Sequence, residues 1–262
     1  MMEFRVSKYT KALRRLMVDH VISRLSPSYQ LNHNGQGAVN FIDVGSVGGL
    51  PEPWRQNANQ VRFLLNFEPN EAPSRTANSM TYNTAVWECD TTLPFYIYKG
   101  FHQTGSSLLK QNHDYVDANF ETLRRRGPPE LAETWRDRST LVRTAELRCR
   151  SLDTILQEAL PDTPFHFLKI DAQGAEYHIL KGAEHLLNTS CAGLHLELFT
   201  LPLYQDMHLL ADVQALLTGH GFELVRKYPA HGSFDSQNDC VFLRPTADAR
   251  VVSVIRKVYG LA

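Results

Sequence analysis

The stretch Phe41-Ile-Asp-Val-Gly-Ser-Val-Gly-Gly49 joins a run of apolar residues to a turn that is rich in glycine. Residues 39–44 read as a buried β-strand, and the glycines that follow permit a tight turn and leave room for a ligand. In an open parallel sheet, ligands bind at the carboxyl ends of the strands, near the point where the strand order reverses. Glycine turns also follow strands that bind nothing, so this motif alone leaves both interpretations open.

A carboxylate at the end of the next predicted strand favours the ligand-binding interpretation. Glu68 directly follows the apolar run 61–67, at about the 20-residue separation from the glycine turn at which a carboxylate can accept both ribose hydroxyls of an adenosine ligand. Val47 and Gly48 break the spacing G-x-G-x-x-G, which disfavours a nicotinamide cofactor. Taken by itself, Glu68 is also compatible with a surface carboxylate that caps a turn.

Strands and helices are expected to alternate along the rest of the chain. This order predicts an α/β fold with a mostly parallel sheet and helices on both faces. The loop 229–239 contains no predicted helix, so its flanking strands should form a hairpin with one antiparallel strand. The further strands are predicted at 81–87, 95–98, 165–170, 193–199, 222–228 and 240–243, and the helices at 151–160, 174–187 and 206–217.

The chain divides into a domain at 39–245 and two flanking segments. The N-terminal segment 1–38 contains a basic amphipathic helix at 4–25, which suits either packing on the domain or contact with a membrane surface. A helical insertion over the site is expected at 110–148, and its run Arg124-Arg-Arg126 suits a solvated helix end or a contact with an anion. The tail 246–262 carries apolar side chains that are candidates for a homodimer contact: Val251, Val252, Ile255 and Val258.

Composition predicts a soluble cytoplasmic protein. The formal net charge is −1, so no overall field favours nucleic acid. Apolar runs fall well short of the ~20 residues that span a membrane, and no signal peptide is evident at the N-terminus. The four cysteines are scattered and form no zinc motif.

The block Phe167-Leu-Lys-Ile-Asp-Ala-Gln-Gly-Ala-Glu176 places three ionisable side chains around the end of another predicted strand. Asp171 should lie beside the ligand crevice, because it follows that strand directly. Lys169 lies within the apolar run, and a buried amine needs a partner. Glu176 falls in the first turn of the next helix, where a negative charge favours the helix dipole, so a structural role is expected for it.

Several ordered motifs in this chain resemble the FkbM family of methyltransferases, and together they run from about Phe41 to Arg244. The block Lys-Ile-Asp-x-Gln-Gly-Ala-Glu is the most specific of them. The others are Ile-Asp-Val-Gly, Phe67-Glu-Pro69, Ser151-Leu-Asp153, Ile179-Leu-Lys-Gly-Ala183, His195-Leu-Glu-Leu-Phe199, Pro202-Leu-Tyr204 and Gly221-Phe222.

The resemblance implies a class I methyltransferase fold, which is Rossmann-like, with S-adenosylmethionine as methyl donor. It implies O-methyl transfer to a hydroxyl of a small-molecule natural product, a sugar or a glycan. Ser46-Val47 departs from the Ala-Asn of many members, so a catalytically degenerate binding protein with the same fold is the alternative. The residues that the resemblance places around the cofactor are Asp43, Gly45, Ser46, Gly49, Glu68, Pro69, Asn83, Ala85 and Asp171.

Methyl transfer to a hydroxyl needs a group that removes the proton of the acceptor, because an alkyl hydroxyl is a poor nucleophile. Asp171, Glu197 and His102 are the candidates, in that order. Asp171 and Glu197 should end adjacent strands, where their oxygens could also bind Mg²⁺. Strand alternation places His195 on the same side as Glu197, and His231 lies in a late loop.

Overall fold

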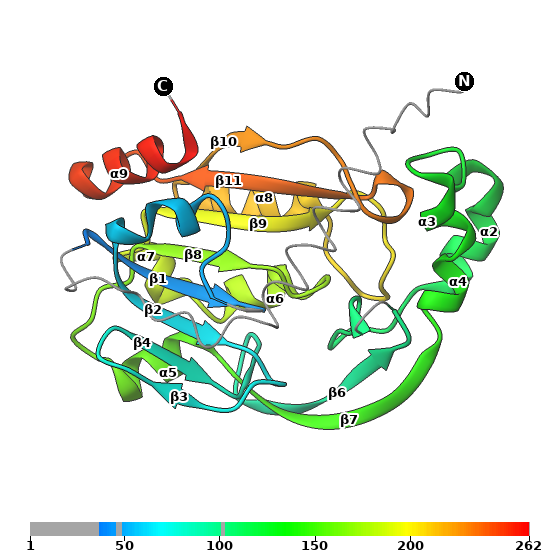
Figure 1. The fold of residues 1–262 in the computed structure, drawn as a ribbon, viewed down its shortest axis with the longest axis horizontal. Helices are drawn as coiled ribbons and strands as arrows, with labels where there is room; N and C mark the ends of the chain where they lie inside the picture. Colours follow the sequence, from blue (N-terminus) through cyan, green and yellow to red (C-terminus); the bar gives the residue numbers. More distant parts are fainter. Residues whose placement is uncertain (1–36, 46–48, 101–102, 262) are drawn as a thin grey trace, which may run out of the picture.

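An eight-stranded sheet forms the centre of the computed structural model, which describes residues 37–45, 49–100 and 103–261 (Figure 1). Its strand order is β10-β11-β9-β8-β1-β2-β4-β3. The strands are β1 (Val39–Val44), β2 (Val61–Phe67), β3 (Ser74–Arg75), β4 (Ser79–Tyr82), β8 (Phe167–Ile170), β9 (Gly193–Phe199), β10 (Glu223–Lys227) and β11 (Gln237–Leu243).

The sheet is mixed rather than mostly parallel with one antiparallel strand. The neighbours β9, β8, β1, β2 and β4 run parallel, and β11 runs antiparallel to both β9 and β10, as the predicted hairpin requires. A second antiparallel strand, β3, pairs with β4 at the opposite edge. The turn between them, where the Thr76 N–H donates to the Ser79 carbonyl, is too short for a parallel connection.

Helices cover both faces of this sheet. Alternate residues of each central strand point to opposite faces, so Ile42 and Leu168 join one buried cluster while Phe41 and Phe167 join another. The first cluster is covered by α5 (Leu152–Ala159), α6 (Glu176–Lys181), α7 (Glu184–Asn188) and α8 (Leu210–Gly219), and the second by α9 (Ala249–Tyr259) and the 3₁₀ helix η1 (Trp54–Gln60).

Two predicted elements are divided in the structure. The helix expected at 174–187 is broken into α6 and α7 around Gly182, where a Cβ atom would lie 2.2 Å from the Trp87 carbonyl oxygen. The strand expected at 81–87 separates into β4 and β5 (Ala85–Val86), because β5 leaves the main sheet to pair with β7 (Leu141–Arg150). Both differences arise from tertiary contacts that local periodicity does not contain.

A long hairpin carries the predicted insertion away from the main sheet. Strands β6 (Thr91–Tyr98) and β7 pair antiparallel, and in Figure 1 they run along the lower side of the molecule toward a group of short helices. The insertion expected to be helical over 110–148 is helical only as far as Arg138, since β7 begins at Leu141. These helices are α2 (His113–Leu123), α3 (Pro129–Glu133) and α4 (Trp135–Arg138).

The C-terminal flanking segment can be compared with its prediction, but the helix predicted in the N-terminal segment cannot. The helix expected at 4–25 lies outside the described residues. The expected tail is instead the helix α9, whose Val251, Ile255 and Val258 are buried in the cluster beneath it, so these side chains are not an exposed surface for a second copy. Within the described ranges, no helix is long and apolar enough to cross a membrane.

Candidate active site

The carboxyl ends of four parallel strands bring the predicted site residues to one edge of the sheet. Asp43 lies near the end of β1, Glu68 follows β2, Asn83 follows β4, and Asp171 follows β8. Asp43 is opposite Asn66 on one neighbouring strand and opposite Lys169 on the other. Residues from distant parts of the chain therefore meet where an α/β sheet binds its ligands.

The glycine turn after β1 is required by a close backbone approach. Gly45 has a φ of 77°, and its N–H donates to the Phe67 carbonyl at 3.0 Å. A Cβ atom there would lie 2.0 Å from the backbone oxygen of Asp171, so only glycine fits. Gly49 also has a positive φ, of 94°. Ser46, a predicted cofactor residue, lies outside the described residues.

Lys169 has the partners that its position in an apolar strand requires. Its Nζ is 3.3 Å from Asp43 Oδ1 and 3.6 Å from Asp171 Oδ2. Burial by itself would lower the pKa of Lys169, but the charges of Asp43 and Asp171 outweigh it, and the pKa is raised. The amine is therefore a cation held between two carboxylates.

Glu68 is half-buried, and its loop is held by neighbouring polar groups. The backbone N–H and the side-chain amide of Asn70 donate to Glu68 Oε1 at 2.9 and 3.0 Å. Burial is the main reason that the pKa of Glu68 is raised. Among the described residues, no donor is bound to Oε2, which leaves this oxygen able to accept a ligand hydroxyl.

Asn83 supports the same loop with its own amide. Its Nδ2 donates to the Pro69 carbonyl at 2.5 Å and to the Glu71 carbonyl at 2.7 Å, which joins the segments that follow β2 and β4. Ala85 is buried in β5. The structure therefore brings Glu68, Pro69 and Asn83 together, and it gives Asn83 a bridging role between their loops.

A glutamine links the two predicted catalytic carboxylates. Gln173 Nε2 donates to Asp171 Oδ1 at 3.2 Å and to Glu197 Oε2 at 2.9 Å. The Gln173 side-chain oxygen accepts from the Tyr204 hydroxyl at 3.1 Å, and Gln237 Nε2 also donates to Glu197 Oε2, at 2.9 Å. Sequence reasoning missed the role of Gln173, although it lies in the most specific motif.

Glu197 has an unusual electrostatic environment. Burial first, and then the charges of Asp171 and Asp239, raise the pKa of Glu197 well above its ordinary value. The described ranges contain no group of three or more His, Cys, Asp or Glu side chains arranged to hold a metal ion. The structure therefore gives no support to a Mg²⁺ site at Asp171 and Glu197.

A second polar group lies beside Glu197. Asp239, opposite Glu197 in β11, is 3.3 Å from His195 Nε2 through one oxygen and 3.3 Å from His231 Nε2 through the other. Burial raises the pKa of Asp239, but its interactions with both histidines outweigh the effect of burial and lower that pKa. The other nitrogen of His195 bonds to the Tyr259 hydroxyl at 3.0 Å, so His195 is fixed on both sides.

His231 is a candidate catalytic residue that sequence reasoning did not select. Its Nε2 is 3.9 Å from Glu197 Oε1, and its pKa is raised because the interaction with Asp239 outweighs the effect of burial. The loop between β10 and β11 gave no signal except the presence of a histidine. His102, the predicted candidate, lies outside the described residues.

The carboxylates at this edge of the sheet can accept hydrogen bonds from ligand hydroxyls and can accept a proton. Residues 51–224 match the family model described as the methyltransferase FkbM domain. No curated protein matches the sequence.

Two solved structures of methyltransferases are similar to this chain, each with 13% sequence identity. Methyltransferase FkbM from Methylobacillus flagellatus KT has a TM-score of 0.41, with 78% of this chain and 43% of that chain covered. Magnesium protoporphyrin IX methyltransferase (ChlM) from Synechocystis PCC 6803, with bound SAM, has a TM-score of 0.38, with 93% and 86% covered. The chain thus spans less than half the length of the Methylobacillus protein. Because the family model matches more than half of the sequence, the protein belongs to the methyltransferase FkbM domain family.

Proposed function

We propose that the protein transfers a methyl group from S-adenosylmethionine to a hydroxyl oxygen of a sugar, a glycan or a natural product. The observation that carries this proposal is the largely buried carboxylate of Glu197, which Gln173 links to Asp171 at the carboxyl edge of the sheet. The family supplies the reaction class. The geometry supports the proposal with a candidate base at a polar edge of the sheet.

The residues at this edge fit the proposed cofactor. Glu68 Oε2 is suited to accept a ribose hydroxyl, and Gly45 allows the backbone at Asp171 to lie close to the end of β1 at this edge. The carboxylates of Asp43 and Asp171 complement a positively charged ligand, although Lys169 offsets part of their charge. When bound, S-adenosylmethionine would supply an activated methyl group.

Glu197 is the best candidate for the general base. Two amides hold its Oε2, while Oε1 faces His231 at 3.9 Å. A carboxylate with a raised pKa accepts a proton more readily than an ordinary one, and general-base catalysis is most effective when that pKa is near the working pH. Asp171 is paired with Lys169 and is assigned a positioning role, so the structure favours Glu197 over Asp171 as the base.

We infer that the segment 110–138 shapes the acceptor pocket. Its Val116 and Trp135 pack in one buried cluster with Phe199, at the end of β9, and with Tyr204. Tyr204 in turn bonds to Gln173, which contacts both Asp171 and Glu197. A change in this segment can therefore alter the position of Glu197 through the side chains of Tyr204 and Gln173.

The test is a transfer assay with S-adenosylmethionine and a panel of sugars, glycans and hydroxylated small molecules. Formation of S-adenosylhomocysteine that depends on a hydroxyl acceptor is expected. Glu197→Gln should reduce turnover by about 10²–10⁴-fold with little change in cofactor affinity, as expected for a lost general base. Asp171→Asn should reduce turnover with a milder loss of binding.

The alternative is a degenerate methyltransferase fold that binds without catalysis. Binding of S-adenosylmethionine, without transfer to any hydroxyl acceptor in the panel, would favour that alternative. Full activity of Glu197→Gln would instead remove Glu197 as the base and leave the reaction class intact.

A further inference from the structure

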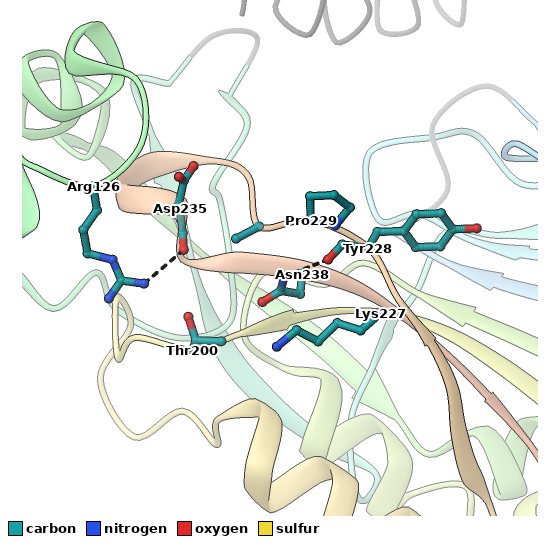
Figure 2. Close-up of a pocket in the computed structure, with 8 residues that line it drawn as sticks. Arg126, Thr200, Lys227, Tyr228, Pro229, Asp235 and Asn238 are labelled. Carbon is teal, nitrogen blue, oxygen red and sulfur yellow. Dashed lines mark hydrogen bonds between the residues drawn. The ribbon is translucent and has the colours of Figure 1, made fainter.

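A polar surface pocket lies where the turn after α2 meets the end of β9 and the hairpin of β10 and β11 (Figure 2). Its volume is about 540 Å³, and its lining includes Arg126, Thr200, Lys227 and Asn238. Arg126 is the last residue of the arginine run in the insertion, and it is the member of that run that lines the pocket.

Two cations face this pocket without a carboxylate partner. Arg126 Nη2 donates to the backbone carbonyl of Asp235 at 3.3 Å, which orients the guanidinium. Within the described residues, neither Arg126 nor Lys227 has a carboxylate within 4.0 Å. Asp235 also lines the pocket, and Figure 2 shows its backbone carbonyl receiving the hydrogen bond from Arg126. A concave surface on which two unpaired cations outnumber one carboxylate attracts an anion.

The neutral polar groups of the pocket are fixed as acceptors. The Thr200 hydroxyl donates to the Ser236 carbonyl at 3.2 Å, and Asn238 Nδ2 donates to the Tyr228 carbonyl at 2.9 Å. Asn238 is only 3% exposed, so its amide is held in place and its Oδ1 remains as an acceptor. Acceptors next to cations suit a ligand that has both an anionic group and hydroxyl donors.

The pocket is separate from the proposed active site. Asn238 is opposite Leu198 in the pairing of β11 with β9, whereas Asp239 is opposite Glu197. Because successive residues of a strand point to opposite faces, the Asn238 side chain lies on the face away from the Glu197 carboxylate.

We propose that this pocket binds the phosphate group of a sugar phosphate. An arginine and a lysine together match a doubly charged phosphate better than a singly charged carboxylate, and the arginine fork can donate two hydrogen bonds to it. The Thr200 hydroxyl and the Asn238 carbonyl accept hydrogen bonds from the sugar hydroxyls.

The test is calorimetric titration of the full chain with glucose 1-phosphate, with inorganic phosphate and glucose as separate probes. The double variant Arg126→Ala/Lys227→Ala should bind glucose 1-phosphate at least about tenfold more weakly than the wild type, a change of about 1.4 kcal/mol. The matched control, Arg125→Ala/Lys257→Ala, removes the same charge from exposed positions outside the pocket and should bind as the wild type does. The affinity should also fall as salt rises.

Three results would overturn the proposal: equal affinity of the two double variants, no binding of glucose 1-phosphate to the wild type, or binding of inorganic phosphate as tight as that of the sugar phosphate. If the double variant fails to fold, the single variant Lys227→Ala, at an exposed position, is compared with the wild type in the same titration. S-adenosylmethionine affinity should be unchanged in the pocket variant, because Glu68 and Asp43 are not part of the pocket lining. A failure of this proposal therefore leaves the proposed methyl transfer standing.

Discussion

Lys169 is the side chain on which the charge balance of the carboxyl edge depends. Its side chain is 16% exposed, and that of Asp43 only 2%. Without the amine, the buried carboxylate of Asp43 would lose this ion pair and would still lie near the carboxylate of Asp171. Removing one partner of a buried ion pair is costly, because the remaining charge loses the attraction that offsets its desolvation.

Lys169→Met should therefore reduce the free energy of unfolding by about 3–5 kcal/mol. Lys181→Met is the matched control, since Lys181 pairs with Glu184 at exposed positions, and it should cost less than about 1 kcal/mol. Urea unfolding of the three proteins measures both changes. Equal losses in the two variants would contradict the importance assigned to the buried pair.

Glu176 is a second buried ionisable side chain, and its ionisation should affect the stability of the fold. Its Oε1 accepts from the Ala172 N–H at 2.9 Å, and burial raises its pKa to about 7. The folded state then holds the proton more tightly than the unfolded state, so the protein loses stability as the pH rises from the ordinary pKa of 4.5 through 7. A shift of this size corresponds to about 3 kcal/mol at full ionisation.

Glu176→Gln keeps an acceptor for Ala172 and cannot ionise. Between pH 5 and pH 8, the variant should lose less stability than the wild type, by up to about 3 kcal/mol. Glu197 titrates in both proteins, and the charge of Glu176 helps to raise the pKa of Glu197, so the difference between their urea unfolding curves reports Glu176 together with its effect on Glu197. Parallel loss of stability in both proteins would show that Glu176 is not the group responsible.

At the scale of elements, the sequence predicts the buried strands of the fold better than the exposed ones. The predicted bounds of β1, β2 and β9 agree with the structure, because strands covered on both faces are continuous apolar runs. The β6–β7 hairpin was missed in large part because β7 is mostly exposed and charged. The break between α6 and α7 was missed because it depends on Trp87, which is distant in sequence.

The candidate site shows the same division. Asp43, Glu68, Asp171 and Glu197 were found because each lies near the end of a strand that the sequence predicts. Gln173 and His231 contact Glu197 from loops, whose paths depend on the folded chain. Strand ends can thus be located from local patterns, whereas the side chains that orient the carboxylates cannot.

Ser151 precedes α5 and provides a test of whether a local side-chain cap stabilises the start of this helix. Ser151 Oγ accepts from the Thr154 N–H at 3.1 Å and so caps the helix that is predicted to begin at this residue. Ser151→Ala should reduce the free energy of unfolding by about 1 kcal/mol. Thr122→Ala, at an exposed position in α2, should change it by less than about 0.5 kcal/mol. Chemical denaturation of both variants measures the two changes. An unchanged free energy of unfolding in Ser151→Ala would contradict the role of Ser151 as a helix cap.

At the scale of the molecule, α9 completes the second face of the sheet. Tyr259 receives a hydrogen bond from Trp54 Nε1 at 3.1 Å and bonds to His195 at 3.0 Å, which connects η1, α9 and β9. The spacing of Val251, Ile255 and Val258 is that of a helix face. The sheet surface that this face covers becomes evident only from the strand order.

Ile255→Ala should accordingly reduce the free energy of unfolding by about 2–5 kcal/mol, because Ile255 is fully buried beneath the helix. Val252→Ala, at a half-buried position one turn away, should cost clearly less. Thermal and urea unfolding of the two variants compare the sites. A negligible effect of Ile255→Ala on the free energy of unfolding would contradict the role of α9 in covering this face of the sheet.

S-adenosylmethionine is expected to bind at the carboxyl edge through Glu68. Calorimetric titration of the wild type, Glu68→Ala and Glu121→Ala with S-adenosylmethionine and with NAD tests it most directly. Glu121 is an exposed carboxylate in α2, remote in sequence from the edge. We expect the wild type to bind S-adenosylmethionine and not NAD, Glu68→Ala to lose about 1 kcal/mol or more, and Glu121→Ala to be unchanged. Binding of NAD alone, or equal affinity of the wild type and Glu68→Ala for S-adenosylmethionine, would contradict the account.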